Sequence, residues 1–467
     1  MRTSPSEPAS SEPSGFAALG VPAALVANLE ALGYATPTAI QAAAVPEILA
    51  SRDVLAEAPT GSGETIAFGL GLLAALDVTR WGPQSLVLCP TRELATQIAG
   101  VLRQLARPIA NVKVLVLCGG VPLLPQIASL RHGAHIVVGT PGRVGKHLRD
   151  GRLELSRVRT CVLDEADRML DMGFGDEVLA LVAACGQPRQ TLLFSATLVG
   201  DVLRVSAAIQ DAPRRVSAGQ ASVPQIAQAF VGLGEAQRED VAAAWLRTHA
   251  PGSALLFCNT RIACASLSAA LVARGIDAAA LHGDLEQPDR ERVLARFAGG
   301  SVRVLVATDV AARGIDLAGL DAVVNIELPF DPEVYVHRIG RTGRAGATGV
   351  AVSLVGDDDL PRLHAIETFA GITAVLERAP EPDSDAPVVA RRVTLCIHAG
   401  RRDKLRPGDI LGACTGQGGI AAVHVGKIEV AERASYVAID RELGATTLRY
   451  LQGVAIKGRR RHITRAT

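Results

Sequence analysis

The stretch "EAPTGSGETIAF", residues 57–68, decides how the first half of this chain is interpreted. Its Gly-Ser-Gly-x-Thr skeleton lets a loop wrap backbone amides around the phosphates of a nucleotide. Such a loop ordinarily carries a lysine just before the threonine, where it meets the β- and γ-phosphates, but this chain has Glu64. The stretch therefore predicts a nucleotide site by architecture, with one residue of the wrong charge.

Short apolar runs follow this loop and alternate with helical patterns. Each run ends in a polar group, which is typical of a buried parallel strand whose carboxyl end carries chemistry. The runs are residues 85–90, 113–118, 135–141, 160–167 and 190–197, then 253–260, 278–284, 302–309 and 322–329. The pattern predicts two successive α/β units, residues 16–217 and 218–376, joined near residues 218–225.

The charge of the chain is unevenly distributed. The 467 residues favour two to three domains, and the formal net charge is only +1. From Arg391 to the end there are 15 Lys and Arg against 6 Asp and Glu, a net charge of +9, whereas residues 1–390 carry a net charge of −8. A basic appendage of this kind indicates nucleic-acid binding.

The basic appendage has its own secondary-structure pattern. Residues 377–390, rich in Pro, Asp and Ala, predict an extended linker before it. Strands are expected at 393–399, 425–432, 435–440 and 453–463, with one helix from 406 to 414 and another before the last strand. Strand, helix, two strands, helix, strand predicts a small RRM-like α+β domain over residues 391–467.

The cysteines and the N-terminus bear on the compartment. Eight cysteines form no CxxC pair and mostly lie in apolar runs, which predicts small buried side chains in a reducing compartment rather than a zinc site or disulfides. Residues 1–15 are rich in Ser, Pro and Glu, which predicts a disordered tail and not a signal peptide. No apolar stretch reaches the roughly 18 residues of a membrane span. We therefore expect a cytoplasmic protein.

An acidic pair ends one of the predicted strands, in "LDEADRMLDMGF" (163–174). In a nucleotide site Asp164 would hold Mg²⁺, usually through water, and Glu165 would orient the attacking water. A bare Asp-Glu pair is common and would by itself favour a solvated acidic turn, and "SAT" (195–197) is also weak evidence alone. The inference rests on the order of all the motifs, which also include "PTREL" (90–94), "TPGR" (140–143), "TDVAARGID" (308–316) and "HRIGRTGRAG" (337–346).

With these motifs in this order, residues 16–375 resemble the DEAD-box family of ATP-dependent RNA helicases. The resemblance implies two RecA-like parallel-sheet domains that bind ATP and Mg²⁺ and couple ATP hydrolysis to local unwinding of an RNA duplex. A DNA-translocating helicase is disfavoured, because the DEAD, SAT and adenine-recognition motifs match RNA unwinders.

The resemblance assigns a nucleotide site to the first unit. By the match of "GYATPTAIQ" (33–41), Gln41 would hydrogen-bond the adenine edge, with Tyr34 or Phe16 packing nearby. Asp316 would bind the ribose, and Thr65 and Asp164 would hold the metal. The phosphate loop would consist of Ala58, Pro59, Thr60, Gly61, Ser62, Gly63, Glu64 and Thr65.

The resemblance also assigns catalytic roles. Arg341 and Arg344 would be arginine fingers that neutralise charge on the γ-phosphoryl group, and His337 would couple to Ser195 and Thr197. Arg338 and Arg341 could instead be surface helix charges. The glycine spacing of "RIGRTGR" is unusual for a stable helix, since each interior glycine costs about 1 kcal/mol, and it favours a functional reading. Since neither half has both the carboxylates and the arginines, hydrolysis would require the halves to close.

RNA would lie across both α/β units, held mainly by its sugar-phosphate backbone. Arg92 could alternatively be a structural ion-pair partner of Glu93. The residues implied in RNA contact are Thr91, Arg92, Gly120, Thr140, Gly142 and Arg143 in the first unit and Gln287, Arg290 and Thr308 in the second.

The C-terminal segments "TLCIHAGRRDKLRPGDILGACTGQGGI", "VGKIEV" and "IKGRRRHI" resemble the RNA-recognition domain of bacterial DbpA-type helicases, as do "LCGG" (117–120) and "LHGDLEQPDRERVL" (281–294) in the core. That resemblance implies a monomer tethered to a hairpin of 23S rRNA in the pre-50S particle. Tyr436 and Tyr450 are the only aromatic residues after Arg391, so base stacking on a sheet is not expected to dominate. Phosphate and base-edge contacts are instead predicted for Lys404, Arg406, Lys427, Lys457, Arg459 and Arg460. A basic face that binds any polyanion is the alternative.

Glu64 sets two outcomes against each other. A carboxylate about 4 Å from a phosphate charge costs roughly 4 kcal/mol at an effective dielectric of about 20, and about 3 kcal/mol already exceeds a hundredfold in affinity or rate. The fold itself should tolerate an acid in the first turn of a helix. The chain is either a helicase, which tolerates Glu64 or is slowed by it, or a pseudo-helicase that binds rRNA as an assembly factor with weak hydrolysis or none.

Overall fold

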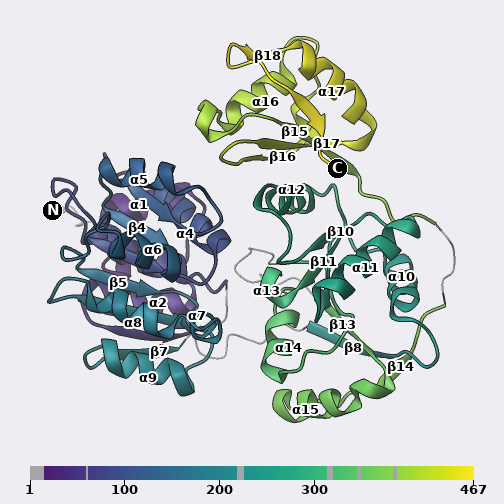
Figure 1. Cartoon of the computed structure of the whole chain (residues 1–467), viewed down its shortest axis with the longest axis horizontal. Coiled ribbons are helices and arrows are strands. Elements are labelled where there is room, and N and C mark those ends of the chain that lie inside the picture. Colours follow the sequence, from purple (N-terminus) through teal and green to yellow (C-terminus); the bar gives the residue numbers. More distant parts are fainter. Residues whose placement is uncertain (1–14, 59–60, 218–225, 313–318, 344–348, 382–385) are drawn as a thin grey trace, which may run out of the picture. The chain divides into compact units, whose positions relative to one another are not determined.

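The computed structural model describes residues 15–58, 61–217, 226–312, 319–343, 349–381 and 386–467 (Figure 1). The chain divides into two compact units. The first holds the N-terminal α/β domain, and the second holds the other α/β domain together with the C-terminal domain. The predicted junction at residues 218–225 lies outside the described residues.

The first α/β domain is built on a seven-stranded parallel sheet in the order β3-β4-β2-β5-β6-β1-β7. All five apolar runs predicted in this domain are confirmed as strands. The strands are β1 (Val54–Glu57), β2 (Ser85–Leu88), β3 (Val114–Leu117), β4 (Ile136–Gly139), β5 (Thr160–Leu163), β6 (Gln190–Ser195) and β7 (Arg214–Ser217). Consecutive strand residues point to opposite faces, so a strand with both faces covered is apolar throughout.

Helices cover both faces of this sheet. Ala56 and Val162 pack with α1 to α4, whereas their neighbours Leu55 and Leu163 pack with α6 to α9. The helices are α1 (Ala23–Ala31), α2 (Ala39–Leu49), α3 (Glu64–Ala74), α4 (Arg92–Leu105), α5 (Leu123–Arg131), α6 (Pro141–Arg149), α7 (Ala166–Asp171), α8 (Gly175–Ala183) and α9 (Gly200–Ile209). The result is a three-layered domain.

Gly139 at the end of β4 permits a close approach to the neighbouring strand. A Cβ placed on Gly139 would lie 2.3 Å from the carbonyl oxygen of Leu117 and 2.6 Å from a methyl carbon of Val144. We expect Gly139→Ala to lower the free energy of unfolding by about 1–3 kcal/mol, because the backbone of β3 must shift. Urea unfolding of the full chain measures this loss.

Gly100 provides the matched control for that substitution. It lies inside α4, and a Cβ there would meet no atom within 4 Å. Gly100→Ala is expected to be neutral or to stabilise the chain by up to about 1 kcal/mol, since alanine favours a helix interior. Equal effects of the two substitutions would contradict the steric explanation for Gly139.

The second α/β domain repeats the plan with seven parallel strands in the order β10-β11-β9-β12-β13-β8-β14. The four predicted runs are confirmed as β9 to β12. The strands are β8 (Ile226–Gly232), β9 (Ala254–Cys258), β10 (Ala278–Leu281), β11 (Val304–Thr308), β12 (Ala322–Asn325), β13 (Gly349–Val355) and β14 (Leu376–Arg378). The helices are α10 (Arg238–His249), α11 (Arg261–Ala273), α12 (Gln287–Ala298), α13 (Asp309–Ala312), α14 (Pro332–Ile339) and α15 (Leu360–Ala370).

The C-terminal domain has a four-stranded antiparallel sheet in the order β16-β17-β15-β20, as expected for an RRM-like α+β domain. One face of the sheet packs on α16 and α17. The elements are β15 (Arg392–Ile397), α16 (Pro407–Thr415), β16 (Val425–Val430), β17 (Ser435–Asp440), α17 (Gly444–Gly453), β18 (Ala455–Ile456), β19 (Arg459–Arg460) and β20 (Ile463–Arg465).

The single last strand predicted at residues 453–463 is wrong. That segment forms the β18–β19 hairpin, and only its last residue belongs to β20. Lys457 (φ 51°) and Gly458 (φ 75°) have left-handed backbone conformations, which turn the chain and interrupt the strand. The segment expected as a linker begins within β14, and Val388 near its end is buried against the second α/β domain.

The other face of the C-terminal sheet contacts α12 within the second unit. Ala295 of α12 packs with Cys396 and Tyr436 of the sheet, and all three are buried. The Thr394 hydroxyl donates a buried hydrogen bond of 2.7 Å to the Ser301 hydroxyl, just after α12. Tyr436 is therefore covered by protein, which agrees with the expectation that base stacking on this sheet does not dominate.

All eight cysteines are free and buried, as the sequence predicts. Within the described ranges, no helix has both the length and the apolar character needed to span a bilayer. The residues described also contain no group of three or more His, Cys, Asp or Glu side chains arranged to hold a metal ion.

Candidate nucleotide and RNA sites

The predicted residues of the first domain fall into two groups at the carboxyl edge of its sheet. The phosphate loop follows β1, Asp164 follows β5, and Ser195 ends β6, and these three strands are neighbours in the sheet. Thr91, Gly120 and Thr140 follow β2, β3 and β4, which are neighbours on the other side. Parallel topology thus places the predicted nucleotide group and the predicted RNA group side by side on one edge.

The phosphate loop owes its shape to its glycines. Gly61 (φ 85°) and Gly63 (φ 100°) have left-handed conformations, and Gly63 is the N-cap of α3. A Cβ on Gly63 would lie 2.3 Å from the side-chain nitrogen of Gln41. The loop thus presents the N-terminus of α3, which begins at Glu64 and includes Thr65, in the orientation that suits an anion. Pro59 and Thr60 lie outside the described residues.

Gln41 joins the predicted adenine motif to this loop. Its side-chain amide nitrogen donates to the Gly63 carbonyl at 3.0 Å, and its side-chain oxygen accepts from the Thr38 backbone at 2.9 Å. Gln41 is buried, and Thr38 and Gln41 form the capping box of α2. Of the two aromatic candidates, Phe16 is buried in the core, whereas Tyr34 is 40% exposed. Contact of Gln41 and either ring with adenine stays a prediction.

Glu64 lies against the acidic pair. Ser62 donates a 2.9 Å hydrogen bond to the Glu64 carboxylate, and Glu64 also shares a hydrogen bond with Asp164. Burial and then the charge of Asp164 raise the pKa of Glu64 well above its usual value. Burial and then the charge of Glu165 raise the pKa of Asp164 to about 7. Glu64, which stands where such a loop ordinarily has lysine, therefore lies in a cluster of acidic side chains with Asp164 and Glu165.

The backbone around the acidic pair is unusual. Glu165 has a left-handed conformation (φ 52°), which is uncommon for a residue with a side chain and is often found at functional sites. Asp164 is buried and donates its backbone N–H to Leu88 of the neighbouring strand at 2.9 Å. The Ser195 carbonyl accepts from Ala58 at 3.0 Å. The SAT and phosphate-loop motifs are thus joined through a backbone hydrogen bond, and half-buried Thr197 follows β6.

Asp167 is a residue that the sequence reasoning missed. Its backbone N–H donates to the Ser195 hydroxyl at 3.4 Å, so the last residue of the "DEAD" motif contacts the "SAT" motif directly. Its side chain is buried and accepts from the Arg168 backbone at 2.8 Å. Its position in the "DEAD" motif is the sequence feature that could have identified it.

Two arginines shape the predicted RNA group of the first domain. Arg92, at the start of α4, donates to the Gly120 carbonyl at 3.1 Å. Arg143 donates to the Val121 carbonyl at 3.1 Å from the first turn of α6. These bonds bring the loops after β2, β3 and β4 together, with Thr91 as the N-cap of α4 and Gly142 in the first turn of α6.

In the second α/β domain the predicted residues also follow strand ends. Thr308 ends β11, and Gln287 and Arg290 lie in the first turn of α12. Arg290 donates to the Ala311 carbonyl at 2.6 Å, so α12 and α13 are tied together. His337 lies in α14, and Arg341 follows it. Asp316 and Arg344 lie outside the described residues.

The alternative reading of Arg338 as a surface charge is wrong. Its side chain is 1% exposed and hydrogen-bonds to several groups at the carboxyl edge of the sheet. The helical position gave no sign of burial, because a charged residue on a predicted helix is usually solvated.

Some of the C-terminal residues predicted to contact RNA lie close to one another in the structure. The Lys457 ammonium donates to the Lys404 carbonyl and lies 3.5 Å from Asp409, which caps α16 beside Arg406. Arg459 and Arg460 form β19 of the same hairpin and are exposed. Lys427 lies on the edge strand β16 and is not joined to this cluster by any described contact.

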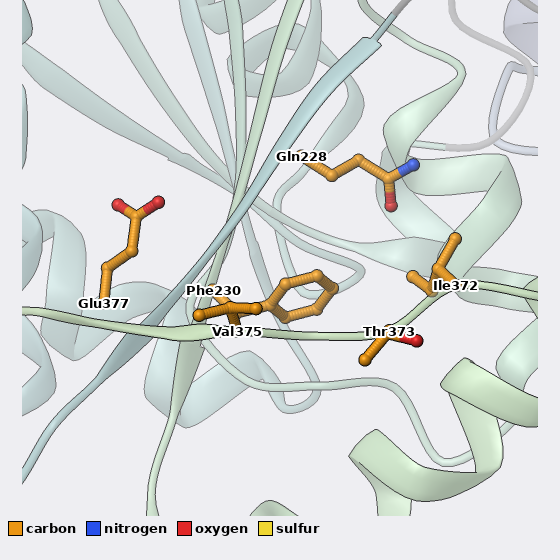
Figure 2. Close-up of a pocket in the computed structure, with 6 residues that line it drawn as sticks. All are labelled: Gln228, Phe230, Ile372, Thr373, Val375 and Glu377. Atoms are coloured by element: carbon orange, nitrogen blue, oxygen red, sulfur yellow. The ribbon is translucent and has the colours of Figure 1, made fainter.

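A pocket of ≈ 270 Å³ lies in the second α/β domain, beside strands β8 and β14. Figure 2 shows its lining residues, which are Gln228, Phe230, Ile372, Thr373, Val375 and Glu377. None of the predicted site residues lines it, so it belongs to neither the nucleotide group nor the RNA group.

Comparison with known proteins follows the same three-part division. The chain matches the DEAD/DEAH box helicase family over residues 38–205, the helicase conserved C-terminal domain over 237–346 and the DbpA RNA binding domain over 394–465.

Similar proteins and structures agree with these matches. The chain is 47% identical over 446 residues to the ATP-dependent RNA helicase DbpA of Escherichia coli, covering 95% of this chain and 98% of that protein. It is 41% identical to the DEAD-box ATP-dependent RNA helicase CshA of Geobacillus kaustophilus over 75% of this chain and 76% of that protein. Saccharomyces cerevisiae Dbp5 bound to RNA and ADP BeF3 matches with a TM-score of 0.69 and 30% identity, covering 78% of this chain and 95% of that one.

The nearly full-length similarity to an ATP-dependent RNA helicase agrees with the two parallel-sheet domains and with the motifs at their strand ends. The chain therefore belongs to the DEAD-box family of ATP-dependent RNA helicases, and within it to the DbpA type with its own RNA-binding domain.

Proposed function

We propose that this helicase acts on 23S rRNA during assembly of the large ribosomal subunit, as a cytoplasmic monomer that uses ATP and Mg²⁺ to separate short RNA duplexes. The observation that carries the proposal is the C-terminal domain. It has a net charge of +9, matches the DbpA RNA binding domain and presents Lys404, Lys457 and Arg459 on one exposed hairpin and loop. A basic surface of this kind suits a folded RNA element.

The nucleotide site fits ATP with magnesium, apart from one residue. Mg²⁺ is usually held by one or two carboxylates together with substrate phosphates, so the buried carboxylate of Asp164 and the hydroxyl of Thr65 suit it better than an all-protein cage would. The metal would neutralise charge on the β- and γ-phosphates. The amides of Gly61 and Gly63 would bind phosphate, and Glu165 would orient the attacking water.

The remaining roles follow the motif matches. Arg341 and Arg344 would stabilise the charge that develops on the γ-phosphoryl group, and His337 would couple that event to Ser195 and Thr197. Thr91, Arg92 and Thr140 in the first domain and Arg290 and Thr308 in the second would hold the RNA backbone. The proposed domains are residues 16–217, 218–376 and 391–467.

Glu64 supports a second candidate, a pseudo-helicase that binds rRNA with little or no hydrolysis. The observation that favours it is the contact of Glu64 with Asp164, which places an acid where phosphate and metal would approach. The substitution Glu64→Lys separates these two candidates.

The substrate proposal has its own experiment. Phosphate release by the full-length chain is measured without RNA, with a hairpin fragment of 23S rRNA, and with an RNA of equal length and unrelated sequence. We expect the rRNA hairpin to reach half-maximal stimulation at an at least tenfold lower concentration, since specific contacts add to charge. Equal half-maximal concentrations for the two RNAs would reject the rRNA proposal and favour a general polyanion surface.

A further inference from the structure

Four neighbouring strands of the first α/β sheet begin side by side at its amino edge. The residues directly before β3, β4, β2 and β5 are Lys113, His135, Gln84 and Arg159, in the order of these strands in the sheet. Backbone hydrogen bonds of 2.8–2.9 Å join each of these residues to the next. Because the strands are parallel, this edge lies opposite the carboxyl edge, which carries the predicted nucleotide and RNA groups.

Trp81 lies in the loop before β2 and is 59% exposed, whereas Trp245 is 5% exposed. Tryptophan side chains are highly buried on average, so the exposure of Trp81 is unusual. The Lys113 ammonium lies 4.5 Å from the centre of the Trp81 ring, and the His135 ring stacks beside it with 6.0 Å between the ring centres. Arg157 donates to the Trp81 carbonyl at 3.0 Å. The ring is therefore held in place while much of its surface faces solvent.

The surroundings of Trp81 are closely fitted. Gly133 has a left-handed conformation (φ 74°), and a Cβ placed on it would lie 3.1 Å from the Trp81 ring. The Lys113 backbone N–H donates to Nδ1 of His135 at 3.1 Å, so this nitrogen carries no proton. Burial and then the charge of Lys113 lower the pKa of His135. His135 thus supports the ring as a neutral side chain, and the positive charge here comes from lysine and arginine.

The cations around Trp81 are not paired with acids. Lys113, Arg157 and Arg159 are exposed, and their described hydrogen bonds go to backbone carbonyl oxygens. Within the described part of the chain, none of the three lies in an ion pair. By contrast, Arg52 before β1 at the same edge is paired with a carboxylate at 2.7 Å, and the acid in the Trp81 loop, Asp77, also forms an ion pair. Three positive charges are therefore left for an external anion.

An exposed aromatic ring among unpaired cations suits single-stranded RNA. Any unpaired base can stack on such a ring, and the cations attract the phosphates on either side of it. In a duplex the faces of the bases are covered by neighbouring base pairs, so the ring would select unpaired nucleotides. A protein partner would require a larger apolar surface. Of the described residues in the loops before these four strands, only Trp81 is a large exposed apolar side chain.

We propose that Trp81, Lys113, Arg157 and Arg159 form a second RNA-binding site, here called the Trp81 site, at the amino edge of the first α/β sheet. One unpaired base stacks on Trp81, and the three cations pair with the phosphates of the same single strand. The Trp81 site lies outside both the RNA group of the carboxyl edge and the C-terminal domain. It goes beyond the proposed function, because it requires neither ATP turnover nor 23S rRNA.

The fluorescence of Trp81 tests this site directly, because a base that stacks on a tryptophan quenches its emission. The full-length chain is titrated with hexauridine in the absence of nucleotide. The full-length Trp81→Phe chain gives the signal of Trp245 alone, which is buried in the second α/β domain. We expect saturable quenching in the native chain and at least about fivefold weaker quenching in Trp81→Phe, since only an accessible ring can stack with a base.

The double variant Arg157→Gln, Arg159→Gln keeps Trp81 as the reporter and removes two of the cations. It should raise the hexauridine concentration at half-maximal quenching by about tenfold. It should also lower the slope of log affinity against log salt concentration by about 0.7 for each lost phosphate contact. Arg52→Gln is the matched control, because it removes an exposed but paired cation from the same edge. It should change the half-maximal concentration less than about twofold, since a distant solvated charge is screened.

Three results would overturn the inference. If hexauridine quenches the native and Trp81→Phe chains equally, or quenches neither, no base stacks on Trp81 and the surface serves another class of partner. If an RNA duplex quenches Trp81 as strongly as hexauridine, the site does not select unpaired bases. If Arg52→Gln weakens binding as much per charge as the double variant, the cations near Trp81 act only through a general field.

Discussion

Replacing Glu64 with lysine should raise RNA-stimulated ATP hydrolysis by the full-length chain by about a hundredfold or more. The substitution removes an acid that contacts Asp164 and places an ammonium group where the β- and γ-phosphates would bind. A single charge about 4 Å away at an effective dielectric of about 20 changes the energy by roughly 4 kcal/mol, and even about 3 kcal/mol exceeds a hundredfold. Steady-state phosphate release at saturating RNA measures the change.

Glu64→Gln separates the loss of the carboxyl group from the gain of the cation. Glutamine removes the carboxyl group that contacts Asp164, but it adds no cation for the β- and γ-phosphates. Glutamine should therefore recover only a small part of the effect of lysine. If the native chain turns over as fast as the lysine variant, the electrostatic argument is wrong, and if the native chain shows no turnover while the lysine variant does, the pseudo-helicase is favoured.

Removing three cations from the C-terminal domain should weaken binding to the 23S rRNA hairpin by about a hundredfold. Lys404 and Lys457 are in contact, and Arg406 begins the adjoining helix, so the triple variant Lys404→Ala, Arg406→Ala, Lys457→Ala removes one continuous cluster. Each lost phosphate contact should also lower the slope of log affinity against log salt concentration by about 0.7–0.9. Titrations at several salt concentrations give both quantities.

Arg449→Ala is the control for this cluster. Arg449 is an exposed cation on α17 in the same domain, so its loss changes the net charge without touching the cluster. It should change affinity less than about threefold, because a solvated charge acts only through a screened field. If Arg449→Ala and the triple variant lose similar RNA affinity per removed charge, the domain attracts any polyanion.

The sequence predicts nine of the fourteen described strands of the two parallel sheets, including the edge strands β3 and β10, and misses β1, β7, β8, β13 and β14. β5 and β9 are buried on both faces, so their residues are continuously apolar and easily recognised. β7 and β14 lie at sheet edges and have mostly exposed side chains, which gives no such pattern. The β18–β19 hairpin was missed because Lys457 adopts a left-handed conformation that its residue type rarely shows.

For the candidate site, the sequence predicts which residues take part better than it predicts their surroundings. The order of the motifs predicts roles for Asp164, Gly63 and Arg341, but it carries no information about how deeply each side chain is buried. Burial of Arg338 and the raised pKa of Asp164 arise from residues distant in sequence, such as Asn259 around Arg338 and Glu64 around Asp164. Contacts that only the folded chain brings together could not be predicted from local patterns.

The buried cysteines can report on the transient unfolding of the domains in which they lie. A thiol reacts with an alkylating reagent only as an exposed thiolate, and burial raises the pKa of Cys258 and holds that of Cys414 at about 11. Native cysteines should therefore label slowly, each at the rate at which its own domain transiently unfolds. Mass spectrometry of a timed alkylation would then rank the local stabilities of the domains in the unmutated protein, and a dye attached to a cysteine introduced on the surface would compete with few native sites.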